Sequence, residues 1–193
     1  MNLKQIVKKG LIVGGLLVAL SGFADANFPK VSADELKSFN RDINGDYVSL
    51  GYDINQDNHE DVKFRYFIYP VEDNKDYTLA YTELDSYAVD KNKDGEFSDD
   101  EWFEPRFSSE EEVQQESVKG KLPNIHPFDL MCYETNRQNN ESNLFLGYDA
   151  DFDGFEELIF YYGLESERFT TLYDYAVDKN NDLEFSDDEW FEY

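Results

Sequence analysis

The sequence predicts an α+β fold made of two tandem, pseudo-symmetric repeats that are rich in antiparallel strands, with short helices after two of the loops. The repeat is visible directly. Residues 87–104 (YAVDKNKDGEFSDDEWFE) and 175–192 (YAVDKNNDLEFSDDEWFE) differ at only two of 18 positions, and LGYD recurs at 50–53 and 146–149. The strands are indicated by the alternation of apolar and polar residues over 62–69, which has the period of two of a half-buried strand.

The elements follow from local patterns. Residues 32–35 (SADE) form a capping box ahead of Leu36 and Phe39, which predicts one short helix. Aromatic and aliphatic residues over 47–52 and 144–148 predict strands that each run into an aspartate. The expected order in each repeat is strand, acidic loop, strand, turn, strand, acidic loop and short helix.

The N-terminus reads as an export signal. Three lysines among the first nine residues precede the apolar run 11–20, and Ala24-Asp25-Ala26 follows it. This pattern predicts a signal peptide over 1–26, and the apolar run is too short to span a bilayer comfortably. We therefore expect a secreted or periplasmic protein with no integral membrane span after cleavage.

The spacing of the repeated segments sets the domain boundaries. We expect repeat 1 over 27–105, an acidic linker over 106–131 and repeat 2 over 132–193. The copies of LGYD are 96 residues apart, whereas the copies of the later acidic loop are 88 apart. The first copy therefore contains eight extra residues, which we place at 70–77 (PVEDNKDY) as a surface turn.

Composition narrows the function. The formal net charge of −26 would repel nucleic acid and anionic membranes and would concentrate cations at the surface. So acidic a chain can be disordered, but the aromatic content of 17% supplies large side chains for a core and favours a folded protein.

Cys132 is the single cysteine, so an internal disulfide is excluded, while a free thiol and an intermolecular bridge both stay open. Bound cations are another means of holding acidic loops together. Cys132 and His126 are six residues apart, but no oxyanion-hole motif accompanies them, and we expect no enzyme activity.

Residues 90–101 have the composition of a calcium loop. Calcium takes six to eight oxygen ligands, which one loop supplies from alternate positions and a distant bidentate carboxylate. At positions 1, 3, 5, 7, 9 and 12 this loop has Asp90, Asn92, Asp94, Glu96 (through its carbonyl), Ser98 (through a water) and Glu101. Gly95 occupies position 6, where the chain must turn sharply.

The last loop, 178–189, repeats this pattern. Its expected ligands are Asp178, Asn180, Asp182, Glu184, Ser186 and Glu189. Leu183 stands at the turn position, where a Cβ costs on the order of 1 kcal/mol if φ is positive. We expect a working site that is weaker or slower than the first; the alternative is a loop that keeps its place in the fold without the ion.

Both loops resemble the EF-hand family, whose 12-residue loop also prefers an apolar residue at position 8, as Phe97 is. The resemblance implies calcium as the bound ion. It does not extend to the entering helix, because residues 77–81 alternate as a strand does, and Pro105 cuts the exiting helix short. The opening of a helix pair in calmodulin-like sensors is therefore not expected here.

Two upstream loops, 53–61 and 149–157, are shorter. They resemble the D-x-[DN]-x-D-G-x-x-[DE] calcium loops of integrin-type and dockerin-like repeat proteins, in which a carboxylate at position 9 replaces the missing one at position 12. The expected ligands are Asp53, Asn55, Asp57 and Asp61 in one loop and Asp149, Asp151, Asp153 and Glu157 in the other. An Asp/Asn-rich hairpin turn is the alternative.

The sequence as a whole predicts an exported, acidic calcium-binding protein in which calcium mainly stabilises the fold. Trp102 and Trp190 follow the last ligand of each EF-like loop, and we expect them to anchor the core. The alternative is an adhesion, partner-binding or inhibitor module with purely structural calcium, and the sequence names no protein partner.

Overall fold

The computed structural model describes residues 29–74, 76–105, 122–123, 125–138, 141–166 and 169–193. The expected signal peptide over 1–26 and most of the expected linker lie outside these ranges. Ten strands form the fold: β1 (Leu36–Arg41), β2 (Tyr47–Tyr52), β3 (Val62–Asp73), β4 (Tyr77–Val89), β5 (Trp102–Phe103), β6 (Leu130–Gln138), β7 (Glu141–Tyr148), β8 (Leu158–Ser166), β9 (Phe169–Val177) and β10 (Trp190–Glu192).

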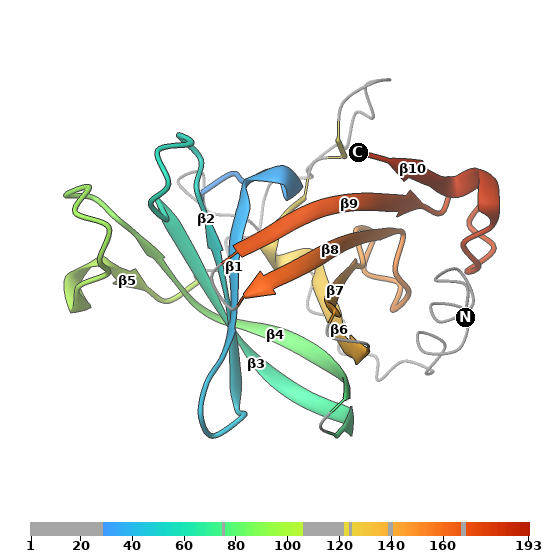
Figure 1. The fold of residues 1–193 in the computed structure, drawn as a ribbon, viewed down its shortest axis with the longest axis horizontal. Coiled ribbons are helices and arrows are strands. Elements are labelled where there is room, and N and C mark those ends of the chain that lie inside the picture. The colour runs from blue at the N-terminus through green and yellow to red at the C-terminus, as the bar shows by residue number, and fades with distance from the viewer. Residues whose placement is uncertain (1–28, 75, 106–121, 124, 139–140, 167–168) are drawn as a thin grey trace.

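All ten strands belong to one antiparallel sheet with the order β1-β2-β3-β4-β6-β7-β8-β9-β10, and β5 pairs with β4. The two repeats join through β4 and β6, where Tyr77 pairs with Asn136 and Tyr81 with Cys132. The sheet coils so strongly that β9 lies beside β1 (Figure 1). There the hydroxyl of Thr170 donates a hydrogen bond to the carbonyl of Leu36.

The expected α+β class is wrong, because the described chain is almost entirely antiparallel sheet. Its helical elements are four single 3₁₀ turns of three residues: η1 (Ala33–Glu35), η2 (Asp99–Glu101), η3 (Pro127–Asp129) and η4 (Asp187–Glu189). Each turn runs directly into a strand. Among the described residues, no helix is long and apolar enough to cross a membrane.

The expected helices do not form because the residues directly after each of these turns pair with a neighbouring strand. The SADE segment does close a turn, in which the backbone N–H of Ser32 donates to the Glu35 carboxylate at 2.7 Å. Leu36 and Phe39 are then buried as strand residues paired with β2, instead of lining one face of a helix. After the EF-like loops, the Trp102 and Trp190 strands pair with β4 and β9. Local capping therefore sets one turn, and pairing with the sheet sets the rest.

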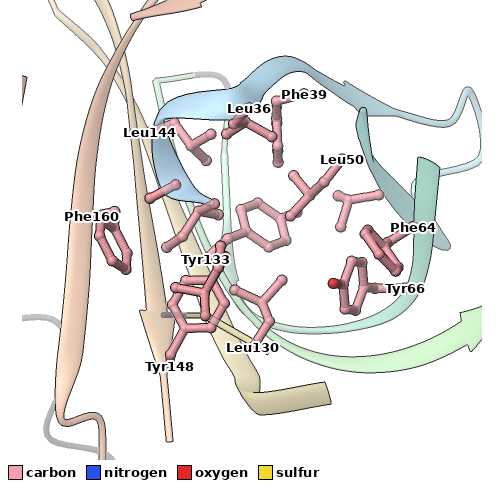
Figure 2. Packing of buried hydrophobic residues seen from close by; sticks show 14 of the residues in the cluster. Leu36, Phe39, Leu50, Phe64, Tyr66, Leu130, Tyr133, Leu144, Tyr148 and Phe160 are labelled. Carbon is pink, nitrogen blue, oxygen red and sulfur yellow. The ribbon is translucent and has the colours of Figure 1, made fainter. Parts of the chain in front are cut away.

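The period-two pattern predicted the core correctly. Val62, Phe64, Tyr66 and Ile68 are all buried. One cluster of buried side chains draws on both repeats, and Figure 2 shows Leu50 and Phe64 of the first repeat packed in the same interior as Leu144 and Tyr148 of the second.

The eight extra residues of the first copy lengthen a hairpin. β3 and β4 have 12 and 13 residues, whereas the equivalent β8 and β9 have nine each. The turn between β3 and β4 is closed by Asn74, whose side-chain oxygen accepts from the backbone N–H groups of Asp76 and Tyr77.

Trp102 and Trp190 are half-buried, which agrees only in part with the expectation that they anchor the core. Trp102 packs beside Phe97 and under the Arg65 guanidinium, 5.2 Å from its ring centroid, and Trp190 packs against a small second cluster that contains Phe145.

Candidate metal site

The four acidic loops occupy equivalent places in the two repeats. Loops 53–61 and 149–157 follow β2 and β7, and loops 90–101 and 178–189 follow β4 and β9. All four have the same backbone path, with a positive φ at the fourth and sixth residues. These residues and their φ angles are Gln56 (61°) and Asn58 (73°), Lys93 (60°) and Gly95 (80°), Phe152 (62°) and Gly154 (93°), and Asn181 (56°) and Leu183 (65°).

This shared path turns the side chains inward. In every loop a backbone N–H at the fifth or sixth position donates to the carboxylate of the first aspartate, as Gly95 does to Asp90 at 2.8 Å and Gly154 to Asp149 at 2.9 Å. The first carboxylate is thereby fixed at the centre of each loop.

Loop 149–157 brings its four carboxylates together. Each of Asp149, Asp151, Asp153 and Glu157 offers an oxygen within 4.8 Å of the others, and within the described part of the chain no other group of three acidic, histidine or cysteine side chains does so. The Glu157 Oε2 atom accepts from the N–H of Ala150 at 2.6 Å. Its Oε1 atom is buried without a hydrogen-bond partner.

A fifth carboxyl group lies against this loop. Asp129 at the end of η3 is 9% exposed, and its backbone carbonyl accepts from the N–H of Asp149 at 2.8 Å. Burial, together with the charges of Asp149 and Glu157, raises the pKa of Asp129 to about 8. Burial likewise raises the pKa of Glu157 to about 7, with Asp149 and its neighbours adding to the shift. These carboxyl groups are crowded and short of positive charge.

A lysine side chain already lies against loop 53–61. The Lys37 ammonium lies 3.4 Å from Asp53 Oδ2 and 3.2 Å from Asn58 Oδ1. In addition, the Asn55 side-chain amide donates to Asp61 Oδ1 at 2.7 Å. Met131 occupies the position of Lys37 in the second repeat, so loop 149–157 has no such ammonium.

In loop 90–101, Glu101 folds back over the start of the loop. It is 3% exposed, and its Oε1 atom accepts from the N–H of Lys91 at 2.9 Å. Its Oε2 atom accepts from the hydroxyl of Ser98 at 2.8 Å. The hydrogen bonds from Ser98, with further ones from the backbone of the loop, lower the pKa of Glu101 and keep it ionised.

Loop 178–189 repeats this arrangement, with Glu189 accepting from the N–H of Lys179 at 3.0 Å and from the hydroxyl of Ser186 at 2.8 Å. Leu183 at the turn position has a φ of 65°, so the expected strain on a residue with a Cβ is present. The side chains of Glu96 and Glu184 are exposed.

Two residues that approach these loops were not predicted from the sequence: Asp129 and Lys37. Asp129 was assigned to the linker, although η3 and the start of β6 repeat the pattern of η1 and β1 at an offset of 94 residues. If this offset is applied to the residues before β2 and β7, Asp129 is the equivalent of Glu35 and Met131 is the equivalent of Lys37.

The candidate Cys–His pair has other partners. The buried Cys132 thiol donates to Glu156 Oε1 at 3.3 Å, and burial raises its pKa well above the ordinary value. His126 Nδ1 accepts from the N–H of Phe128, on whose ring it stacks. A neutral, hydrogen-bonded thiol is a poor nucleophile.

The fold and the loops define an antiparallel β protein with an internal duplication and four acidic loops of one backbone type. The chain matches no family model, no curated protein and no solved structure.

Proposed function

We propose that this protein binds calcium ions in its acidic loops and that the ions mainly stabilise the fold. The observation that carries the proposal is the convergence of four carboxylates in loop 149–157, with one buried oxygen of Glu157 left without a partner. An orphaned buried oxygen is costly, and a bound cation would offset that cost.

The donor set fits calcium better than other divalent ions. Carboxylate, amide and carbonyl oxygens are hard ligands, and calcium accepts six to eight of them in a flexible arrangement. Asp149, Asp151, Asp153 and Glu157 would hold the ion in this loop. Zinc and copper prefer nitrogen and sulfur ligands, and none of the loop ligands is a histidine or cysteine.

The two EF-like loops support the same proposal. Asp90, Glu101, Asp178 and Glu189 are all less than 10% exposed, although none forms a salt bridge with a lysine or arginine among the described residues. Loop 53–61 is the weakest candidate, because Lys37 already neutralises part of its charge. We therefore rank the loops with 149–157 and 90–101 first, 178–189 next and 53–61 last.

Binding would couple to stability. Each ion bound only by the folded state stabilises it by mass action, by about 2.7 kcal/mol at a free concentration one hundred times the dissociation constant. Calcium modules that work outside the cytosol bind at about 0.1–1 mM, so occupancy would follow the surroundings instead of a cytosolic signal.

The test is calorimetry and thermal unfolding of the chain from residue 27 onward, with calcium and with magnesium. We expect at least two calcium equivalents and a clear rise in melting temperature, and a much smaller rise with magnesium. Asp151→Asn should remove one equivalent, whereas Asp76→Asn, at an exposed carboxylate outside the loops, should not. A melting temperature that is unchanged by calcium and by chelator would end the proposal.

A further inference from the structure

The two acidic loops of each repeat are joined by a backbone hydrogen bond. In the first repeat the N–H of Asp90 donates to the carbonyl of Asp61 at 2.9 Å. In the second repeat the N–H of Asp178 donates to the carbonyl of Glu157, also at 2.9 Å. In both repeats the acceptor is the last expected ligand of the short loop, and the donor is the first expected ligand of the EF-like loop. The bond therefore connects candidate ligand residues of two neighbouring sites.

Glu157 is held at three points around loop 149–157. Its N–H donates to the carbonyl of Tyr148 at 3.0 Å, which closes the base of the loop. Its carboxylate accepts from the N–H of Ala150 at 2.6 Å and belongs to the converging group of four carboxylates. Its carbonyl accepts from Asp178. A change at the Glu157 side chain therefore reaches Asp178 through a single residue.

Asp61 has the same connections in the first repeat. In addition to the bond at its carbonyl, its N–H donates to the carbonyl of Tyr52 at 2.8 Å, and its Oδ2 atom accepts from the N–H of Ile54 at 2.8 Å. The two loops of this repeat also approach each other closely, since a Cβ on Gly95 would lie 2.7 Å from the Nδ1 atom of His59. The contact between a short loop and its EF-like neighbour is thus a feature of both repeats.

Asp178 extends the connection into its own loop. Its two carboxylate oxygens accept from the backbone N–H groups of Asn181 at 2.7 Å and Leu183 at 2.9 Å. These are the two residues of the loop that have a positive φ. Fixing the backbone of Asp178 therefore orients the first ligand of the loop together with the turn that this ligand holds.

Binding at the short loop would favour this ordered arrangement. Without an ion, the four converging carboxylates of loop 149–157 repel one another, and holding each residue in one conformation costs backbone entropy. With an ion bound, Glu157 is held in place, so Asp178 is already ordered when a second ion binds loop 178–189. Repulsion between the two ions acts in the opposite direction, but physiological salt screens charges beyond about 8 Å.

We propose that the two loops of each repeat bind calcium with positive cooperativity, and that the backbone bond between their ligand residues couples them. The coupling rests on the proposed function, because it describes how occupancy of one candidate site changes the affinity of the next. The alternative is a bond that only ends the β3–β4 and β8–β9 ladders, in which case neighbouring loops bind calcium independently.

The test is a calcium titration followed by NMR. The reporting amides for loops 149–157, 178–189 and 90–101 are those of Phe152, Asn181 and Lys93. Asp153→Ala removes the fifth-position ligand of loop 149–157 and should weaken calcium at loop 178–189 at least fivefold, which corresponds to about 1 kcal/mol. Asp182→Ala should weaken loop 149–157 by the same factor, since coupling between two binding sites is reciprocal.

The first repeat provides the matched control. Asp57→Ala, at the equivalent position of loop 53–61, should weaken loop 90–101 and leave loop 178–189 within about twofold of the original. Figure 1 shows the chain segments before β5 and before β10 on opposite sides of the molecule, so each EF-like loop reports its own repeat. In sodium chloride at about 1 M the Debye length falls to about 3 Å, so an effect of the deleted charge disappears while coupling through ordered backbone remains.

Hydrogen exchange of the Asp178 N–H follows the bond directly. In the Asp182→Ala variant, calcium should slow this exchange by about tenfold, because loop 149–157 then holds the acceptor on Glu157. The proposal is overturned if Asp153→Ala leaves loop 178–189 within about twofold of the original, if Asp57→Ala weakens loop 178–189 as much as Asp153→Ala does, or if calcium leaves the exchange of Asp178 unchanged. Calcium bound in both loops without coupling ends only this proposal, whereas a chain that binds no calcium ends it together with the proposed function.

Discussion

The hydroxyl of Tyr162 donates a hydrogen bond of 3.0 Å to the backbone carbonyl of Ala33, 129 positions earlier in the chain. Its equivalent in the first repeat, Tyr66, donates at the same distance to the carbonyl of Pro127. Ala33 and Pro127 are themselves equivalent, since they begin η1 and η3. Each repeat therefore closes the N-terminal turn of the other, and we infer that neither repeat completes its core alone.

Tyr162→Phe should destabilise the protein by about 1–2 kcal/mol, because it removes a buried hydrogen bond and leaves the Ala33 carbonyl without that donor. Tyr66→Phe should cost a similar amount. Urea unfolding at fixed calcium measures both. Tyr69→Phe is the control, since the hydroxyl of Tyr69 meets Glu83 at an exposed site and should contribute less than 0.5 kcal/mol. Equal effects of all three substitutions would contradict the role of the inter-repeat bonds.

Much of the fold was predictable from the sequence, but its class was not. Alternation over 62–69 correctly identified the buried face of β3, because a period of two admits only one face to a core. The capping box at Ser32 was read as a helix start, and short helices were also expected after the two EF-like loops. A capping box specifies one turn, and the decision between helix and strand beyond it depends on partners such as β2 and β4, which are remote in the sequence.

Cys132→Ser should preserve the fold and stability. Cys132 donates to Glu156 beside Gly147, and Ser38 of the first repeat donates to Glu60 at 2.6 Å beside Gly51, in the equivalent arrangement. A serine at 132 thus repeats an arrangement that the chain already contains.

We expect Cys132→Ser to shift the free energy of unfolding by less than about 1 kcal/mol. Cys132→Val, which removes the donor and leaves Glu156 buried without it, should cost about 1–3 kcal/mol. Thermal and urea unfolding compare the two variants. The two substitutions would have equal effects if the thiol served only to fill space.

Glu134 gives the protein a pH-dependent stability. It is 1% exposed on β6, and burial raises its pKa to about 7, with the nearby Tyr77 hydroxyl opposing and Glu72 adding to the shift. A carboxyl group whose pKa is higher in the folded state stabilises the fold below its unfolded pKa of about 4.5. That contribution is lost as the pH rises through about 7.

Glu134→Gln should therefore stabilise the protein at pH 8 by roughly 2 kcal/mol and have little effect at pH 4.5. Glu104→Gln, at an exposed carboxylate, should have little effect at either pH. Melting temperatures over this range, measured with chelator present, provide the comparison. A stabilisation that is the same at both pH values would show that the charge of Glu134 is not its cause.

The positions of the four acidic loops were predictable from the sequence, whereas the side chains that approach these loops from elsewhere in the fold were not. The spacing of aspartates located all four loops, because a loop that surrounds one ion must present oxygens at alternate positions. Lys37 and Asp129 were missed, since each approaches its loop from a neighbouring strand or turn. The positive φ at the fourth residue was also missed, because Lys93 and Phe152 show no preference for that conformation.

Leu183→Gly should tighten calcium binding by loop 178–189. Leu183 has a φ of 65°, which costs a residue with a Cβ about 1 kcal/mol, and glycine would relieve that cost. The expected gain in affinity is about fivefold. Gly95→Leu tests the converse in loop 90–101, where a Cβ would lie 2.7 Å from His59 Nδ1 and must displace that side chain. Calorimetry should show the two substitutions acting in opposite directions, and any gain from Gly95→Leu would contradict a role for backbone strain in calcium affinity.

Lys37 and Met131 occupy equivalent positions, and exchanging them should exchange the behaviour of the two short loops. The Lys37 ammonium lies at Asp53, at a site where both side chains are less than one-fifth exposed. Lys37→Met should therefore lower the melting temperature in chelator, because the ion pair is lost. It should also tighten calcium binding at loop 53–61 by roughly five- to tenfold, since the ion no longer competes with the ammonium. Met131→Lys should weaken loop 149–157 to a similar degree and stabilise the calcium-free protein, whose carboxylates gain a counter-charge. Amide resonances of Gln56 and Phe152, followed during a calcium titration, report the two loops separately. If neither substitution changes calcium affinity in its own loop, then Lys37 is a surface ion pair with no influence on the ion.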